Sequence, residues 1–179
     1  MSSGNSMPML KWLWLSAVVI LLDMVTKAMA SEMLELRHPV KILPGFYFTL
    51  MHNPGAAFSF LSDESGWQRW FLSVVAIGVS AMIMVWLMRL DKTQSRLALA
   101  LSLILGGALG NVWDRLSLGY VVDFIDVYLV VFRWPAFNIA DSAITIGVII
   151  FAYDTFKVSK AEAAAKAAEQ NHSDSEKAE

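Results

Sequence analysis

Four apolar stretches of this chain are each long enough to cross a lipid bilayer. They cover residues 10–30, 70–90, 97–113 and 136–156 of the 179. A membrane-spanning helix needs about 20 mostly apolar residues. The chain is 56% hydrophobic and 17% charged, and a soluble domain of this size could not bury that much apolar surface. The sequence therefore predicts a mainly α, polytopic membrane protein with four transmembrane helices.

The first stretch has an alternative interpretation as a cleaved secretory signal. Lys11 precedes an apolar run over 12–22, and Ala28-Met29-Ala30 resembles a cleavage site. However, Asp23 and Lys27 interrupt the run before that site, and three further spans follow. We therefore expect an uncleaved membrane helix.

The segment between the first two long stretches contains strand formers and a turn signal. Phe46-Tyr47-Phe48-Thr49-Leu50 favours a strand, and Asn53-Pro54-Gly55 favours a turn. We predict a small extracytoplasmic β-platform over about 38–62, formed by a hairpin at the membrane surface. The apolar run 127–132 is too short to span a bilayer, and Asp126 and Arg133 flank it.

Basic residues predict how the chain is oriented in the membrane. Loops rich in Lys and Arg stay in the cytoplasm. Such residues occupy the loop between spans two and three and the tail after span four: Arg89, Lys92, Arg96, Lys157, Lys160 and Lys166. Both termini are then cytoplasmic, and 31–69 and 114–135 face the other side. We expect residues 1–156 to form one integral membrane domain and 157–179 a polar cytoplasmic tail that is partly disordered.

In this topology, polar residues from separate parts of the chain gather at the outer membrane interface. They are Asp23, Lys27, Asn111, Asp114, Arg115, Asp123, Asn138 and Asp141. Ionisable groups inside a bilayer are costly, so they are candidate functional residues.

Simpler interpretations of several of these residues remain open. Asp23 and Lys27 are four residues apart and could only pair along a helix. Asp114 and Arg115 could be interface anchors, and Asp126 is expected to be a solvated loop residue. Residues 106, 107 and 110 are glycines, whose small size favours close helix packing.

Asp123 and Asp141 are the strongest candidates for catalysis. Asp123 lies in an apolar segment, and Asp141 shares a predicted helix face with Asn138. Two carboxyls in a low-dielectric pocket cannot both ionise cheaply, so one serves as a general base and the other as a general acid. Such a pair can activate water to cleave an amide bond.

Other chemistries are less compatible with the composition. The chain has no Cys, which excludes a thiol nucleophile, and its 3 His residues lack a paired metal-ligand spacing. Ser142 lacks a convincing basic partner for a serine mechanism. A net charge of −2 gives no basic face for nucleic acid. We therefore expect no metal, no cofactor and no nucleic-acid partner.

Five motifs in order make the sequence resemble the bacterial lipoprotein signal peptidases, or signal peptidase II. They are Asp23-Met24-Val25-Thr26-Lys27, Asn53-Pro54-Gly55-Ala56-Ala57-Phe58, Gly106-Gly107-Ala108-Leu109-Gly110-Asn111-Val112-Trp113-Asp114-Arg115, Val121-Val122-Asp123-Phe124 and Phe137-Asn138-Ile139-Ala140-Asp141-Ser142. The resemblance extends over essentially the whole region 12–156.

The resemblance implies an aspartic endopeptidase with Asp123 and Asp141 as its catalytic dyad. It implies removal of signal peptides from diacylglyceryl-modified prolipoproteins by cleavage on the amino side of the lipidated Cys, and inhibition by globomycin. It also implies a location in the bacterial inner membrane, with the site near the periplasmic face. We expect a monomer that contacts membrane lipid and its substrates. The expected substrate-binding or site-supporting residues are Asp23, Lys27, Asn53, Gly55, Asn111, Asp114, Arg115, Asn138 and Ala140.

Two other functions remain as alternatives to the peptidase. A small transporter could use the carboxylates as a proton relay, although its polar groups should then continue through the full depth of the membrane. An assembly factor could use the Gly-rich span for helix contacts, but that function leaves Asp123 and Asp141 unexplained.

Overall fold

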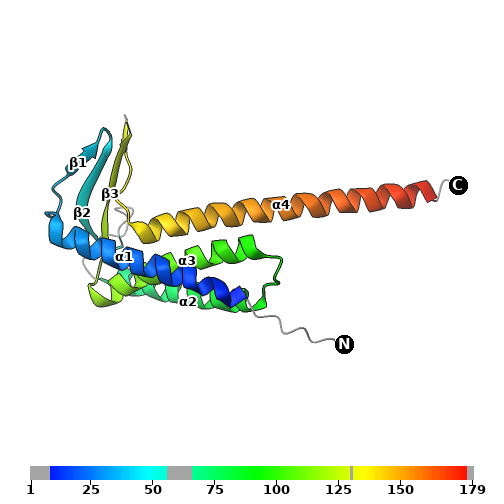
Figure 1. Ribbon diagram of the computed structural model, residues 1–179, viewed down its shortest axis with the longest axis horizontal. Helices are drawn as coiled ribbons and strands as arrows, with labels where there is room; N and C mark the ends of the chain where they lie inside the picture. The colour runs from blue at the N-terminus through cyan, green and yellow to red at the C-terminus, as the bar shows by residue number, and fades with distance from the viewer. Residues whose placement is uncertain (1–8, 56–65, 130, 177–179) are drawn as a thin grey trace.

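A computed structural model describes residues 9–55, 66–129 and 131–176 (Figure 1). A short 3-10 helix, η1 (Met9–Trp12), leads into α1 (Leu13–Met33). Strands β1 (Val40–Leu43) and β2 (Phe46–Asn53) follow, and then helices α2 (Trp67–Arg89) and α3 (Ser95–Ser117). Strands β3 (Val121–Leu129) and β4 (Phe132–Arg133) precede the long final helix α4 (Ile139–Glu176). The fold is mainly helical, with one small sheet.

The four predicted spans are confirmed as helices. Within the described residues, four helical segments are long and apolar enough to cross a membrane: Met9–Met33, Trp67–Arg89, Ser95–Ser117 and Ile139–Ala161. The last helix continues well past the predicted end at residue 156, because α4 reaches Glu176. Residues 157–176 include many Ala and no Gly or Pro, so nothing in this segment stops the helix. The described part of the tail is therefore helical.

Helix α3 is the centre of the bundle, because it packs against α1, α2 and α4. Its glycines allow the close approach. A Cβ added at Gly106 would lie 2.9 Å from the carbonyl oxygen of Ser16 in α1, and one at Gly107 would collide with the carbonyl oxygen of Ala140 in α4. Small residues at such crossings let helix backbones come together. The geometry therefore supports the packing role expected for this Gly-rich stretch.

The sheet lies across one end of the helix bundle, and η1 and the last turns of α4 lie toward the other end (Figure 1). Its four strands are antiparallel in the order β1-β2-β3-β4. In β2, one extra residue interrupts the register with β3 between Phe48 and Met51, and the consecutive residues Thr49 and Leu50 are both buried. A bulge of this kind changes where the side chains point. After it, Met51 pairs with Asp123.

The predicted β-platform is present, but its hairpin turn lies earlier than the sequence indicated. The turn between β1 and β2 is at Pro44 and Gly45, whereas Asn53 ends β2. Gly45 has a φ of +78°, and a Cβ there would lie 2.8 Å from the carbonyl oxygen of Tyr128. A glycine is required at this turn for both reasons. The end of the predicted platform, residues 56–62, lies outside the described residues.

Strand β3 was not predicted, although it forms the inner wall of the platform. Residues 121–124 are all buried, so the strand lacks the alternation of apolar and polar residues that identifies a half-exposed strand. Its main partner, β2, is about 70 residues earlier in the chain. No local pattern could reveal that pairing.

We predict that Gly107→Ala lowers the stability of the folded protein. The new methyl would press on the Ala140 carbonyl and force α3 and α4 apart, and overpacking of this kind costs about 1–3 kcal/mol. The measurement is thermal unfolding of the purified protein in detergent. Gly78→Ala in α2 is the matched control, because a Cβ there meets no atom within 4 Å. Equal melting temperatures for the two variants would contradict the close packing.

Candidate active site

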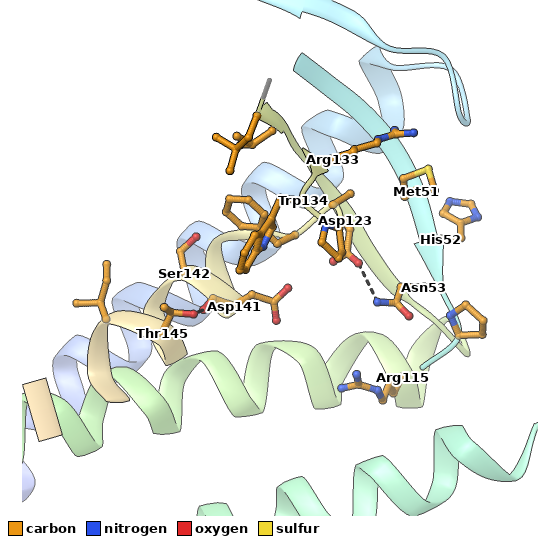
Figure 2. Close-up of a pocket in the computed structure, with 17 residues that line it drawn as sticks. Met51, His52, Asn53, Arg115, Asp123, Arg133, Trp134, Asp141, Ser142 and Thr145 are labelled. Carbon is orange, nitrogen blue, oxygen red and sulfur yellow. Dashed lines mark hydrogen bonds between the residues drawn. The ribbon is translucent and has the colours of Figure 1, made fainter. Parts of the chain in front are cut away.

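The two candidate carboxyls come from different elements and face one cavity. Asp123 lies on β3, and Asp141 lies in the first turn of α4. Both line a cavity of about 950 Å³ where the sheet meets the helices. Figure 2 shows both side chains directed into the space between the strands and α3. The fold therefore brings together two residues that are 18 positions apart in the sequence.

Asn138 connects the two carboxyls directly. Its Nδ2 donates to Asp123 Oδ1 at 2.7 Å, and its backbone N–H donates to Asp141 Oδ2 at 3.4 Å. Asn138 Oδ1 in turn accepts a hydrogen bond from the Asp141 backbone N–H at 2.9 Å. These reciprocal bonds form a capping box that begins α4. One fully buried side chain therefore both starts the helix and fixes the relative positions of the carboxyls.

Asp123 is buried next to a second acid, and this changes its protonation. Its Oδ2 accepts a hydrogen bond from Asn53 Nδ2 at 3.0 Å, shown by the dashed line in Figure 2. Burial, and then the negative charge of Asp141, raise the pKa of Asp123 to about 7. The hydrogen bonds from Asn53 and Asn138 act in the opposite direction but do not cancel this shift. Asp123 therefore holds its proton up to a neutral pH.

Asp141 lies at the start of a helix and contacts α3. Its Oδ1 accepts a hydrogen bond of 2.7 Å from Asn111 Nδ2 on α3. It also lies in the first turn of α4, where the helix dipole stabilises negative charge. The two carboxyls thus occupy unlike environments within one cavity.

A buried ammonium group links the residues behind the cavity. Lys27 Nζ lies 2.7 Å from Asp23 Oδ2 and 2.9 Å from Asp114 Oδ2, and it donates to Asn111 Oδ1 at 3.1 Å. The pairing of Asp23 with Lys27 along one helix is therefore real. The contacts of Lys27 with Asp114 and Asn111 on α3 show that this pair also belongs to a larger network.

The acids around Lys27 extend this network to the backbone near the cavity. Asp23 Oδ1 accepts a hydrogen bond from the Ala140 backbone N–H at 2.9 Å, which satisfies a free donor at the start of α4. Asp114 Oδ2 accepts one from the Val122 backbone N–H at 3.1 Å, next to Asp123. Both elements that carry the candidate carboxyls are thus held by the same charged cluster.

Arg115 and Gly55 complete the predicted set. Arg115 lines the cavity, and its Nη1 donates to the Asn111 carbonyl oxygen at 3.3 Å. Its Nε is buried and has no hydrogen-bond partner in the described part of the chain. The Gly55 backbone N–H donates to Asn53 Oδ1 at 2.9 Å, which orients the Asn53 amide toward Asp123. All the residues proposed from the sequence therefore lie at or directly behind this cavity.

The expectation that Asp126 is a solvated loop residue is wrong. Asp126 is in β3 and fully buried, and its carboxylate accepts hydrogen bonds from Arg133 at 3.1 and 2.7 Å and from Thr49 Oγ1 at 2.7 Å. Burial acts to raise the pKa of Asp126, but the bonds from Arg133 and Thr49 outweigh it and keep that pKa below its ordinary value. The sequence analysis missed this pair, although both residues flank the apolar run 127–132.

Over residues 9–55, 66–129 and 131–176, no group of three or more His, Cys, Asp or Glu side chains is arranged to hold a metal ion. The acids of the cavity are instead paired with amides, with Lys27 or with Arg133.

Fold and site together define a polytopic membrane protein with two carboxyls, one buried and one half-buried, at a cavity at one end of its helix bundle. The model of the family described as signal peptidase (SPase) II matches residues 15–157. The chain is 54% identical over 151 residues to the lipoprotein signal peptidase of Teredinibacter turnerae, an alignment covering 84% of this chain and 90% of the relative. It is 52% identical over 159 residues to that of Pseudomonas aeruginosa, covering 87% and 94%.

A solved structure described as a bacterial membrane enzyme has the same fold. It superposes with a TM-score of 0.73 at 30% identity, covering 82% of this chain and 93% of that one. The chain therefore belongs to the signal peptidase II family, as its motifs indicated. It is a multi-pass membrane peptidase, and this membership favours the peptidase over the transporter and the assembly factor.

We predict that Lys27→Met strongly destabilises the protein. The substitution leaves Asp23 and Asp114 as unpaired buried acids, and breaking a buried ion pair on one side costs about 3–5 kcal/mol. Thermal unfolding in detergent is the measurement. Lys41→Met on the exposed strand β1 is the control and should unfold like the wild type. A Lys27→Met variant as stable as the control would mean that the ammonium does not hold the helices together.

Proposed function

We propose that this protein is an aspartic endopeptidase that removes signal peptides from diacylglyceryl-modified prolipoproteins. Cleavage falls on the amino side of the lipidated Cys, and Asp123 and Asp141 are the catalytic dyad. The observation that carries the proposal is the link through Asn138, which holds the buried carboxyl of Asp123 and the half-buried carboxyl of Asp141 at one cavity. The family membership supports the substrate class, since the relatives are named lipoprotein signal peptidases.

The unlike surroundings of the two acids support different roles for them. Asp141 at the N-terminus of α4 is the general base, and Asp123, which keeps its proton up to about pH 7, is the general acid. Asp141 takes a proton from water as the water oxygen attacks the scissile carbonyl carbon, and Asp123 gives its proton to the carbonyl oxygen.

The tetrahedral intermediate then collapses and the C–N bond breaks. The Cys nitrogen leaves as an amine after taking the proton held on Asp141, while the carbonyl oxygen returns its proton to Asp123. The signal peptide leaves with a new carboxyl group. This cycle regenerates both acids and requires neither a metal nor a cofactor.

The supporting residues have distinct tasks in this proposal. Arg115 lines the cavity and offers its charged guanidinium to substrate carbonyl oxygens. Asn53, Asn111 and Asn138 orient the two carboxyls. Lys27 with Asp23 and Asp114 holds the elements that carry them.

The proposed setting is the bacterial inner membrane, with both termini in the cytoplasm and the cavity near the periplasmic face. The basic loop between α2 and α3 supports this orientation, because it lies at the end of the bundle opposite the sheet (Figure 1). We propose that the protein acts as a monomer, binds its substrate from the lipid phase and is inhibited by globomycin.

We predict that Asp123→Asn and Asp141→Asn each abolish measurable cleavage of a diacylglyceryl-modified prolipoprotein by the purified protein. An amide can act as neither base nor acid, and loss of such a group lowers turnover about 10²–10⁴-fold. Cleavage is followed by the gel shift of the substrate.

Asp91→Asn provides the matched control, because Asp91 is exposed in the loop between α2 and α3. That variant should cleave at the wild-type rate. Near-normal turnover in either dyad variant would refute the assignment. Proton flux through reconstituted wild-type protein without any proteolysis would favour the transporter.

We also predict that kcat/KM falls as the pH rises above about 7. The acid must carry a proton, and the raised pKa of Asp123 means that it loses this proton near neutrality. Because that pKa lies above the value in an unfolded chain, the proton on Asp123 also stabilises the fold, and this contribution is lost as the pH rises from about 4 to about 7.

Melting temperatures must therefore be recorded at every pH to separate catalysis from unfolding. A rate that keeps rising well above neutral pH, in protein that is still folded, would show that Asp123 is not the acid.

A further inference from the structure

Arg133 is a second arginine at the cavity, and the sequence motifs do not include it. Its side chain is 49% exposed and lines the same cavity as Asp123 and Asp141. Figure 2 shows it beside the strands, away from Arg115 on α3. Two guanidinium groups thus line the cavity, that of Arg133 beside the strands and that of Arg115 on α3.

One edge of the Arg133 guanidinium is fixed. Nε and Nη2 donate to the two oxygens of Asp126, and the guanidinium carbon lies 4.7 Å from the centre of the Tyr128 ring. Asp126 is itself held by Thr49. A guanidinium held by two hydrogen bonds to one carboxylate has a fixed orientation. Nη1, in contrast, makes no hydrogen bond to any residue that the structure describes.

The edge of the guanidinium that carries Nη1, called the free edge below, is therefore available for a ligand with oxygen acceptors. A charged donor that is already oriented loses less entropy on binding than a mobile one. Hydrogen bonding to Asp126 also raises the pKa of Arg133, so the guanidinium keeps its charge.

The cavity wall near Arg133 is apolar, which suits a lipid-modified ligand. Leu129, Trp134 and Ile146 line the same cavity. At the neighbouring β3–β4 hairpin, Val131 is 95% exposed and Phe132 is 52% exposed. Exposed apolar clusters of this kind are unfavourable in water, and Trp prefers the interface between lipid and water. We therefore expect Arg133 to lie at the depth where lipid ester groups meet water.

We propose that Arg133 is a substrate-binding residue whose free edge donates to a carbonyl oxygen at the lipidated end of the substrate. Asp126 is a positioning residue that acts through Arg133. This inference rests on the function proposed above. The acceptor belongs either to a glycerol ester of the diacylglyceryl group or to the peptide after the Cys. The two sources share the same chemistry, and the experiment below separates them.

The experiment measures kcat and KM in phospholipid-free detergent micelles, with a synthetic diacylglyceryl-modified prolipoprotein peptide as substrate. Arg133→Gln should raise KM about tenfold, which is the loss of one hydrogen bond to a charged group, while kcat changes less than about twofold. Arg133→Lys should restore part of the affinity, because it keeps the charge without the fork. Arg37→Gln, on the exposed outer part of the platform, is the matched control and should leave KM unchanged.

A double-mutant cycle tests the role of Asp126. Asp126→Asn should raise KM, because the guanidinium is no longer held by a charged partner. Asp126→Asn combined with Arg133→Gln should resemble Arg133→Gln alone, since the two residues act as one unit. The double variant also leaves no unpaired buried acid at this position, so it keeps the test valid if Arg133→Gln alone fails to fold.

A second substrate with ether-linked chains identifies the acceptor. If the ester carbonyl is bound, the wild type should bind this substrate more weakly and Arg133→Gln should add no further effect. A full effect of Arg133→Gln on the ether substrate assigns the acceptor to the peptide, which also supports the proposal.

The outcomes separate this inference from the proposed function. Wild-type cleavage with an unchanged KM in Arg133→Gln would overturn the role of Arg133 alone. A fall in kcat at constant KM, with a lower melting temperature, would show a structural role and also overturn it. Absence of wild-type cleavage would overturn the proposed function itself.

Discussion

The buried ammonium of Lys27 is the interaction on which the rest of this structure depends. A cation within a membrane-embedded bundle is costly unless several acceptors surround it. Here the acceptors come from α1 and α3, and they are Asp23, Asn111 and Asp114. Those acids in turn bind backbone N–H groups of Ala140 and Val122. Satisfying one charge therefore fixes two helices, the start of α4 and the strand that carries Asp123.

The two candidate catalytic acids share one cavity, but their surroundings differ. Asn138 binds both of them, but Asp123 is a buried strand residue and Asp141 is at a helix N-terminus. Burial and the negative charge of Asp141 raise the pKa of Asp123. Their unlike environments follow from the convergence of a sheet and a helix, which supports the separate roles proposed for them.

The platform extends the site beyond the helices. Its bulge in β2 buries Thr49 against Asp126, and Asp126 directs Arg133 along the cavity wall. The same sheet carries Asn53 and Asp123. One small sheet thus contributes Asp123, the amide of Asn53 that orients it, and the guanidinium of Arg133. The exposed apolar β3–β4 hairpin of the same sheet is expected to meet lipid. In this protein, the strands therefore do more than cover the bundle.

The sequence by itself determined the four spans and the polar set, because long apolar runs and charges within them are local signals. It predicted Asp123, Asp141 and the residues now seen around Lys27, partly from depth and partly from family motifs. The turn at Pro44-Gly45 and the continuation of α4 to Glu176 also have local signals, a Pro-Gly pair and a segment without Gly or Pro. Only the tertiary structure decided that β3 pairs with β2 and that Asp126 is buried. Both depend on contacts between distant segments, such as the hydrogen bond from Thr49 to Asp126, which no local pattern contains.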